Sequence, residues 1–194
     1  MEEKFVAYFS RIQPLSPEEK EAIIKDLDIR KVEKGTVFLK EGQTPLYNYF
    51  VLEGCVRKYY LRDGYEQSSQ FFTEDEWILP AIGSMDPIIS NYHLACVEDS
   101  WLIFGNDKEG NELLKTFPKF QELAMQILEK EVLKQQEKLL KYQNSNPEER
   151  YLDLLKDRPQ LINRIPQYQL SSYLGVKPES LSRIRKRIAD KEKS

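Results

Sequence analysis

The segment from residue 175 to 188, GVKPESLSRIRKRI, holds the densest group of side chains that could bind a charged partner. Its basic residues stand among apolar residues at helical intervals, so one helix would have both a basic and an apolar side. Basic side chains bind phosphate groups, and an arginine can also donate two hydrogen bonds to a guanine. The segment is therefore either an ordinary solvated helix end or a surface that binds a polyanion. The residues concerned are Arg183, Arg185, Lys186 and Arg187, with Leu181, Ile184 and Ile188 between them.

The distribution of charge separates this segment from the rest of the chain. The 194 residues have a net charge of −3, but residues 177–194 contain seven basic and three acidic side chains and so have a net charge of +4. Residues 1–176 then have a net charge of −7. A small basic end on an acidic body is expected when only one part of a protein meets an anion.

The elements around the basic segment predict a helix-turn-helix. We expect helices over Pro147–Lys156, Gln167–Leu174 and Pro178–Ala189, the first of them begun by a capping box of Asn146 and Glu149. Gly175 can adopt a positive φ in the tight turn between the last two helices. The apolar residues at helical spacing would form a small core: Leu170, Leu174, Val176, Leu181 and Ile184. The third helix would then expose polar residues: Pro178, Glu179, Ser182, Arg183 and Lys186.

A long helix is predicted before this unit, with Thr116 as its cap, Pro118 in its first turn and its end near Tyr142. Along one face of this helix, apolar residues and a single glutamine recur with alternating spacings of 3 and 4, which is typical of a coiled-coil contact. At ~1.5 Å per residue the helix would be about 36 Å long, more than a compact β-domain can cover. Leu123 and Ile127 are expected to pack on the protein's own sheet. The other face favours a parallel dimer through Met125, Leu128, Val132, Gln135, Leu139 and Tyr142.

The first half of the chain changes from a helical to a strand period. Ser16, Pro17 and Glu19 predict a capped helix that runs to about Asp26. Short strands with turn signals at Gly35, Gly42, Gly54 and Gly64 follow, which is typical of an antiparallel sandwich or barrel. Asp63-Gly64 predicts a hairpin turn. Further strands are expected near residues 92–97 and 100–104.

Several classes of function find no support in the sequence. There is no apolar run long enough to cross a membrane and no secretory signal, so we expect a cytoplasmic protein. Cys55 and Cys96 have no metal or disulfide spacing, and His93 is the single histidine. No nucleophile motif or phosphate loop is present. We therefore expect no catalytic site, no metal and no cofactor.

Two long segments resemble the Crp/Fnr family of bacterial transcription regulators. RYLDLLKDRPQLINRIPQYQLSSYLGVKPESLSRIRKRI is similar to its C-terminal winged helix, and KVEKGTVFLKEGQTPLYNYFVLEGCVRKYYLRDG to its cyclic-nucleotide-binding β-roll. YLGVKPESLSRIRK resembles the branch found in Bacteroidetes-type bacteria. The resemblance implies an α+β protein: an antiparallel β-roll (double-stranded β-helix) over residues 1–115, a dimerisation helix over 116–143, and a helix-turn-helix domain over 144–194 whose wing is truncated to ADKEKS.

The resemblance also implies roles for individual residues. The Glu-x-x-Ser-Arg pattern that reads bases in the Fnr branch corresponds to Glu179, Ser182 and Arg183. Pro178 replaces the arginine that reads guanine in the Crp branch, and Pro166 replaces a frequent capping threonine. The positions that contact phosphates correspond to Gln167, Tyr168, Lys177, Ser180 and Lys186.

Cyclic AMP is disfavoured as an effector. Leu79-Pro80 and Ser90-Asn91 stand where nucleotide-binding members have Gly-Glu and Arg-Ser, and Glu74, Asp75 and Glu76 are nearby. A buried phosphate without a positive partner is costly. The roll would bind either another ligand, apolar or aromatic, among Phe71, Phe72, Trp77 and Tyr92, or none.

The sequence therefore predicts a homodimeric transcription regulator with double-stranded DNA and RNA polymerase as partners. It would read a pseudo-palindromic site, and the turn-forming residues between Tyr142 and Asn146 would be a hinge. An alternative is a ligand-sensing signalling module whose C-terminal helices bind a protein. A third possibility is a purely structural dimer in which the arginines are solvated charge.

Overall fold

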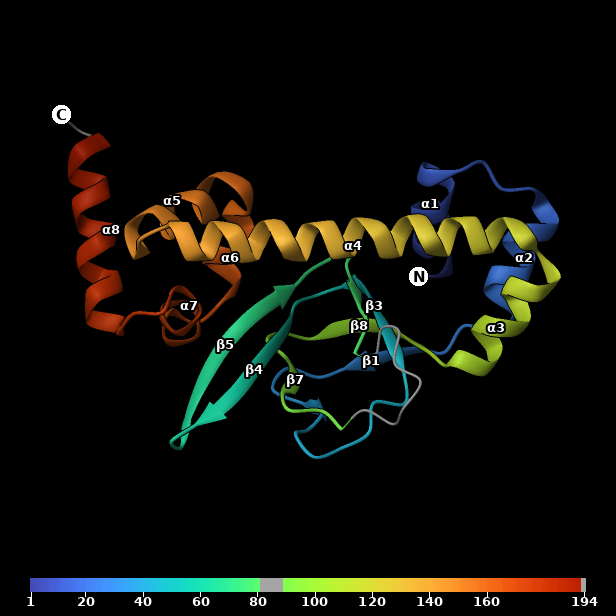
Figure 1. The fold of residues 1–194 in the computed structure, drawn as a ribbon, viewed down its shortest axis with the longest axis horizontal. Helices are drawn as coiled ribbons and strands as arrows, with labels where there is room; N and C mark the ends of the chain where they lie inside the picture. The colour runs from blue at the N-terminus through green and yellow to red at the C-terminus, as the bar shows by residue number, and fades with distance from the viewer. Residues whose placement is uncertain (81–88, 193–194) are drawn as a thin grey trace.

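The computed structural model describes residues 1–80 and 89–192. A β-roll lies under one long helix, and small helical groups lie at the two ends of that helix (Figure 1). The strands are β1 (Ile29–Val32), β2 (Val37–Leu39), β3 (Asn48–Glu53), β4 (Val56–Arg62), β5 (Tyr65–Phe72), β6 (Trp77–Ile78), β7 (His93–Cys96) and β8 (Ser100–Gly105). The helices are α1 (Glu2–Ile12), α2 (Pro17–Lys25), α3 (Asp107–Thr116), α4 (Pro118–Asn144), α5 (Pro147–Asp157), α6 (Pro159–Arg164), α7 (Gln167–Leu174) and α8 (Pro178–Glu192).

The strands form two four-stranded sheets with the orders β1-β8-β3-β6 and β2-β7-β4-β5, and every pairing is antiparallel. The predicted hairpin is confirmed, since Arg62 pairs with Tyr65 across the turn. Asp63 and Gly64 both have positive φ, as a tight hairpin turn requires. The strands predicted near residues 92–97 and 100–104 are β7 and β8.

Apolar and aromatic side chains fill the space between the two sheets. The roll core contains Val51, Val56, Leu94 and Leu102, none of which is exposed to solvent. The predicted turn glycines have positive φ. Gly54 is required for a second reason, because a Cβ on it would lie 2.2 Å from Oγ of Ser100.

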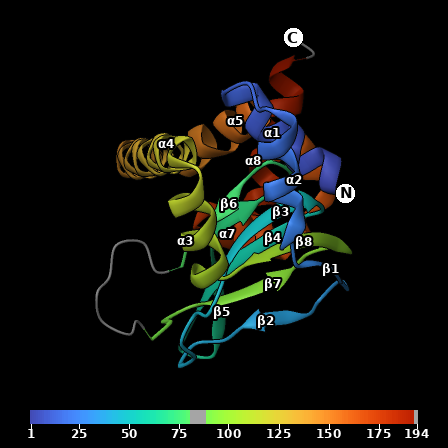
Figure 2. The same ribbon diagram turned by 90° about the vertical axis from the view of Figure 1, so that its right-hand side faces the viewer.

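Helices α1, α2 and α3 lie against the roll at the end where α4 begins (Figure 2). The capping box of α2 is confirmed: the N–H of Glu19 donates to Oγ of Ser16, and the Glu19 carboxylate accepts from the Ser16 N–H. The prediction that Thr116 caps the long helix is wrong. Phe117 is the N-cap, and Thr116 ends α3 with its hydroxyl donating to the carbonyl of Glu112. A threonine hydroxyl can donate to the carbonyl four residues earlier in its helix, and this bond competes with capping of the next helix.

The predicted long helix is confirmed as α4, which has 27 residues and ends two residues later than expected. Leu123 and Ile127 are buried, as predicted for the side that packs on the roll. Figure 2 looks along α4 and shows it on the outside of the roll. Most of the helix circumference is therefore exposed in one chain.

Four helices follow α4, and the predicted capping box of Asn146 and Glu149 begins the first of them. The structure differs from the prediction of three helices in this region. Residues 159–164 form an additional helix, α6, and α8 runs to Glu192 rather than to Ala189. Pro159 sits in the first turn of α6, where its missing N–H costs nothing. The core of this unit includes Leu161, Leu170, Leu174 and Leu181, which are almost completely buried.

Among the helices that the structure describes, none is long and apolar enough to span a bilayer.

Candidate nucleic-acid interface

The turn between α7 and α8 has the geometry that a helix-turn-helix needs. Gly175 follows α7 with φ 73° and ψ 31°, the left-handed conformation predicted for it. Its N–H donates to the carbonyl of Ser172, and the N–H of Val176 donates to that of Ser171. These bonds satisfy carbonyls at the end of α7 and fix the direction in which α8 leaves.

Helix α8 has an apolar side and a charged side. Leu181, Ile184 and Ile188 are 0%, 7% and 8% exposed and belong to the core of the C-terminal helices. The basic side chains between them are all exposed. In Figure 1, α8 stands at the outer end of the molecule, across the direction of α4, so the charged side is accessible.

The three predicted base-reading residues lie together on the first half of α8. Glu179, Ser182 and Arg183 are all exposed. Gln167 at the start of α7 donates a hydrogen bond of 2.7 Å from its side-chain nitrogen to Oγ of Ser182. This contact ties the starts of the two helices together and leaves the Ser182 hydroxyl hydrogen free to donate elsewhere.

The predicted phosphate-contacting residues surround this group. Gln167, Tyr168, Lys177 and Lys186 are exposed, and Tyr168 is 59% accessible. Ser180 is half-buried, and its hydroxyl accepts a hydrogen bond of 3.2 Å from Arg183. The structure therefore brings the predicted base and phosphate sets onto adjoining parts of α7, the turn and α8.

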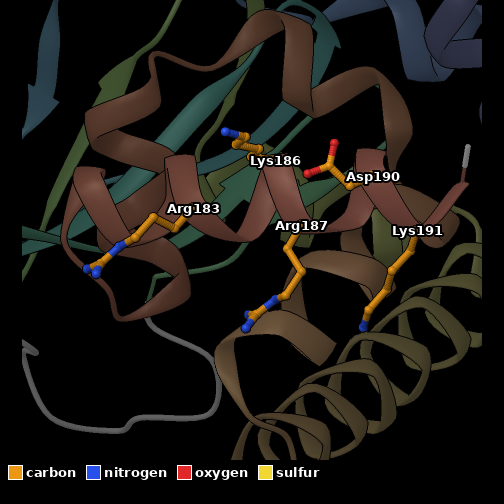
Figure 3. Close-up of a pocket in the computed structure, with 5 residues that line it drawn as sticks. All are labelled: Arg183, Lys186, Arg187, Asp190 and Lys191. Carbon is orange, nitrogen blue, oxygen red and sulfur yellow. The ribbon is translucent and has the colours of Figure 1, made fainter.

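An open groove of about 510 Å³ runs along the remainder of α8. It is lined by four cations and one acid: Arg183, Lys186, Arg187, Lys191 and Asp190. Figure 3 shows Arg183, Arg187 and Lys191 projecting to one side of the helix and Lys186 and Asp190 to the other. Arg187 and Lys191 form ion pairs with Glu148 of α5. Among the described residues, Lys186 and Arg183 have no carboxylate partner.

The four residues predicted to bind an effector are not brought together. Phe72 and Tyr92 lie in the roll core, Phe71 packs with the C-terminal helices, and Trp77 packs with α1 and donates to the Tyr8 hydroxyl. The sequence analysis did not single out Lys58, which lies beside one of these aromatic residues. Its Nζ is 3.7 Å from the centroid of the Tyr92 ring, and burial lowers the pKa of its ammonium group. Successive residues of a strand point to opposite faces of the sheet, so the adjacent Phe71 and Phe72 lie on opposite faces.

The positions aligned with nucleotide-binding residues show no phosphate site among the described residues. Ser90 is buried, and its hydroxyl donates to the carbonyl of Tyr92. Leu79 and Pro80 are half-buried. Residues 81–88, which the aligned stretch includes, lie outside the described part of the chain.

The single histidine and the two cysteines are packed among other side chains of the roll. His93 stacks on Tyr59 with ring centroids 4.9 Å apart, and its Nε2 lies 3.7 Å from a carboxylate oxygen of Glu41. Burial raises the pKa of Cys55 to about 12 and that of Cys96 to about 11. Both thiols are therefore poor nucleophiles at neutral pH.

Sequence reasoning also missed the role of the acids Glu74, Asp75 and Glu76. They were interpreted only as unfavourable neighbours for a bound phosphate. In the structure each pairs with a cation from another element: Glu74 with Arg164, Asp75 with Arg11, and Glu76 with Arg158 and Lys134. The sequence did contain a signal for these pairs. The three adjacent acids are complementary in charge to Arg158 and Arg164, which lie near the two ends of the loop expected between residues 156 and 167.

The residues predicted to form a dimer contact leave a broad exposed apolar face on α4. Met125, Val132 and Leu139 are 66%, 43% and 58% exposed. Tyr142 is 46% exposed, Leu128 is half-buried and Gln135 is exposed. Leu133 and Leu140, which are 53% and 59% exposed, extend the face beyond the predicted set.

No protein-family model matches the sequence, and no curated protein is similar enough to match it. Solved structures do match. FixK2 from Bradyrhizobium japonicum aligns with a TM-score of 0.72 at 16% identity, covering 86% of each chain. The c-di-GMP-responsive global regulator CLP of Xanthomonas campestris aligns with a TM-score of 0.68 at 17% identity, covering 91% of this chain and 93% of that one. A CooA mutant from Carboxydothermus hydrogenoformans aligns with a TM-score of 0.67 at 11% identity, covering 94% and 83%.

These likenesses show the fold. The chain has the architecture of the Crp/Fnr regulators, an antiparallel β-roll, a long helix and a C-terminal helix-turn-helix, and the predicted α+β class is confirmed. The Bacteroidetes-type branch, the domain limits and the roles of individual residues remain predictions.

Proposed function

We propose that this protein is a transcription regulator of the Crp/Fnr type that binds double-stranded DNA as a homodimer. The observation that supports this most is the construction of α8. Its apolar residues hold it on α5 and α7, while Glu179, Ser182 and Arg183 face solvent beside cations with no carboxylate partner in the described residues. Such a surface suits the major groove, where affinity comes from phosphates and specificity from base edges.

Each residue would have a distinct task in the bound state. Arg183 would donate two hydrogen bonds to a guanine, Glu179 would accept one from a cytosine amine, and Ser182 would contact either base type. Lys177 and Lys186 would neutralise phosphates on either side, and Gln167, Tyr168 and Ser180 would add neutral phosphate contacts. Because Gln167 already bonds Ser182, phosphate binding and base reading would be coupled through that hydrogen bond.

The exposed face of α4 would be covered by the same helix of a second copy. Apolar residues repeat along it at coiled-coil spacing, and Met125, Val132, Leu139 and Tyr142 are each more than 40% exposed in the single chain. Two copies related by a twofold axis would place the two α8 helices in successive major grooves about 34 Å apart. Replacing Val132 and Leu139 together by aspartate is expected to give monomers in sedimentation equilibrium.

Cyclic AMP would not be the effector. The described residues at the aligned positions, Leu79, Pro80, Ser90 and Asn91, supply no positive charge, and Glu74 and Glu76 already pair with cations of the C-terminal helices and α4. Calorimetric titration with cyclic AMP is expected to show no binding. RNA polymerase would be the partner through which bound dimers act.

The alternative is a module whose C-terminal helices bind a protein. Interfaces of that kind have an apolar or aromatic anchor at their centre. The apolar residues Leu181, Ile184 and Ile188 of α8 are all buried, so among the described residues of this helix the exposed side is polar and basic. For α8, this favours DNA over a protein partner.

Selection from a pool of random duplexes tests the proposal directly. The purified protein, without added ligand and at near-physiological salt, is expected to enrich a motif with twofold symmetry. Enrichment of a single unsymmetrical half-site would argue against a dimer. No enrichment from protein shown to be folded and dimeric, with or without a cell extract as a source of effector, would contradict the function.

A further inference from the structure

The C-terminal helices are attached to the roll by a group of ion pairs centred on α6. Arg164, the last residue of α6, donates from Nη1 and Nη2 to the two carboxylate oxygens of Glu74 at 2.9 and 2.8 Å. Its Nε donates to Glu98, at 3.0 Å. Glu74 follows β5, and Glu98 lies between β7 and β8. One arginine thus joins two separate loops of the roll to the C-terminal helices.

A second arginine stands at the other end of α6. Arg158 donates from Nη2 to Glu76 at 2.7 Å and to the Thr73 hydroxyl at 2.8 Å, and from Nη1 to the Phe71 carbonyl at 2.9 Å. Lys134 of α4 also pairs with Glu76. The side chains of Glu76 and Arg158 are only 13% and 19% exposed. Glu76 therefore joins the roll, the long helix and the C-terminal helices.

The loop that carries these acids is itself held firmly on the roll. The Asp75 N–H donates to the carbonyl of Val51 in β3, and the Val51 N–H donates to the carbonyl of Glu76. The N–H of Gly54 donates to the Glu74 carboxylate. A displacement of this loop relative to β3 would therefore break backbone hydrogen bonds as well as ion pairs.

Apolar and hydroxyl contacts lie beside the ion pairs. Phe71 packs edge-to-face on Tyr173 of α7 at 5.4 Å. The Ser68 N–H donates to the Ser172 hydroxyl, which donates to the carbonyl of Glu66. Apolar burial is non-directional, whereas the paired Arg164–Glu74 bonds accept little rotation. The orientation of the C-terminal helices is therefore set by the arginine bonds together with the hydroxyl hydrogen bonds between β5 and α7.

We propose that Arg158 and Arg164, bound to Glu74, Glu76 and Glu98, are the positioning residues that set where α8 stands relative to the roll and α4. This inference rests on the proposed function, since it concerns how the reading helices are spaced. If α8 could move relative to the rest of its subunit, fixing two α8 helices on one symmetric DNA site would cost free energy. A fixed position of α8 in each subunit removes this cost. The ion pairs supply that fixed position, and a change in the loop at residues 73–76 would reach α8 through them.

The test removes the charges from the roll and leaves the DNA-reading unit untouched. The variant combines Glu74→Gln, Glu76→Gln and Glu98→Gln, because glutamine keeps a carbonyl oxygen that can still accept the N–H bonds of Gly54 and Thr73. The matched control is Asp75→Asn, in the same loop, where Asp75 pairs with Arg11 of α1 instead. Asparagine also tolerates the positive φ of 64° at this position.

Two measurements are made on each protein. Spin labels at Tyr65→Cys on the β4–β5 hairpin and Arg185→Cys on α8 report the distance between roll and reading helix, and the two native cysteines are buried. DNA affinity is measured on the selected palindrome and on the same duplex with one half scrambled. We expect the triple variant to broaden the distance distribution and to bind the palindrome at least tenfold more weakly, with less than a twofold change on the single half-site. The control is expected to match the wild type in both.

An unchanged distance distribution would overturn the inference, and so would a broadened one with full palindrome affinity. Equal losses on palindrome and half-site would also overturn it, because they would indicate damage to the reading surface. If the wild type selected no DNA, the proposed function would fail, while the distance measurement would still decide whether the ion pairs fix α8.

Discussion

Two pairs of cations in the C-terminal helices differ in burial and in their partners. Arg158 and Arg164 on either side of α6 are 19% and 22% exposed and pair with carboxylates of the roll. Arg183 and Lys186 on α8 are exposed and have no carboxylate partner among the described residues. Paired, half-buried cations hold elements together, and unpaired, exposed ones remain available to a ligand. In the function we propose, the same side-chain chemistry thus serves attachment at one end of the unit and recognition at the other.

The largest expected effect comes from removing the apolar support of α8 while leaving its cations in place. Leu181→Ala takes away a side chain with no solvent exposure. Truncations of this kind leave a cavity, so the free energy of unfolding is expected to fall by about 3 kcal/mol. Urea denaturation measures it. Leu152→Ala, at a residue that is 43% exposed on α5, is the control, with an expected change below about 0.5 kcal/mol.

Removing one acid from the attachment side is expected to have a smaller effect that depends on pH. Burial raises the pKa of Glu76, but the Arg158 charge and the hydrogen bond from Lys134 outweigh it, so the pKa lies below the usual 4.5. A carboxylate of this kind stabilises the fold above pH 4.5, and its contribution is lost as the pH falls through the folded-state pKa. Glu76→Gln is expected to lower the free energy of unfolding by about 2 kcal/mol at pH 7.

The difference between wild type and Glu76→Gln is expected to shrink as the pH is lowered below 4.5. Denaturation series from pH 7 to pH 3 measure it. A difference that stays constant over this range would mean that the charge of Glu76 contributes nothing to the attachment.

The smallest effect is expected at a cation on the recognition side. Lys186→Ala is expected to weaken binding to every DNA sequence and to lower the slope of log K against log salt by about one. Its effect on stability is expected to be negligible, because the residue is exposed. Lys191→Ala provides the comparison, and a smaller loss is expected there because its ammonium already pairs with Glu148. Titrations of fluorescent duplex at several salt concentrations measure both, and equal slopes for wild type and Lys186→Ala would rule out a phosphate contact at Lys186.

The parts of this molecule that local rules determine were predictable from sequence. Capping residues located the starts of α2 and α5, Asp63-Gly64 located the hairpin, and Gly175 located the turn before α8. Each of these signals acts within a few residues of the chain. The alternation of apolar and basic residues on α8 likewise predicted which side chains are buried.

Contacts between distant segments were not predictable in the same way. Phe71 and Phe72 are adjacent, yet one faces the C-terminal helices and the other the roll core, and only the strand pairing decides which. The attachment of Arg164 to Glu74 joins residues 90 positions apart. Composition can indicate that such acids and arginines complement each other, but it cannot state which pairs form.

The central claim, that α8 reads DNA sequence, is tested most directly by selecting sites in parallel with the wild type and Arg183→Ala. We expect both proteins to enrich a symmetric motif, with preference lost at one base pair of each half-site in the variant and affinity for the wild-type site lowered by about 1–3 kcal/mol. Identical motifs from the two proteins would contradict the assignment of α8 as the reading helix.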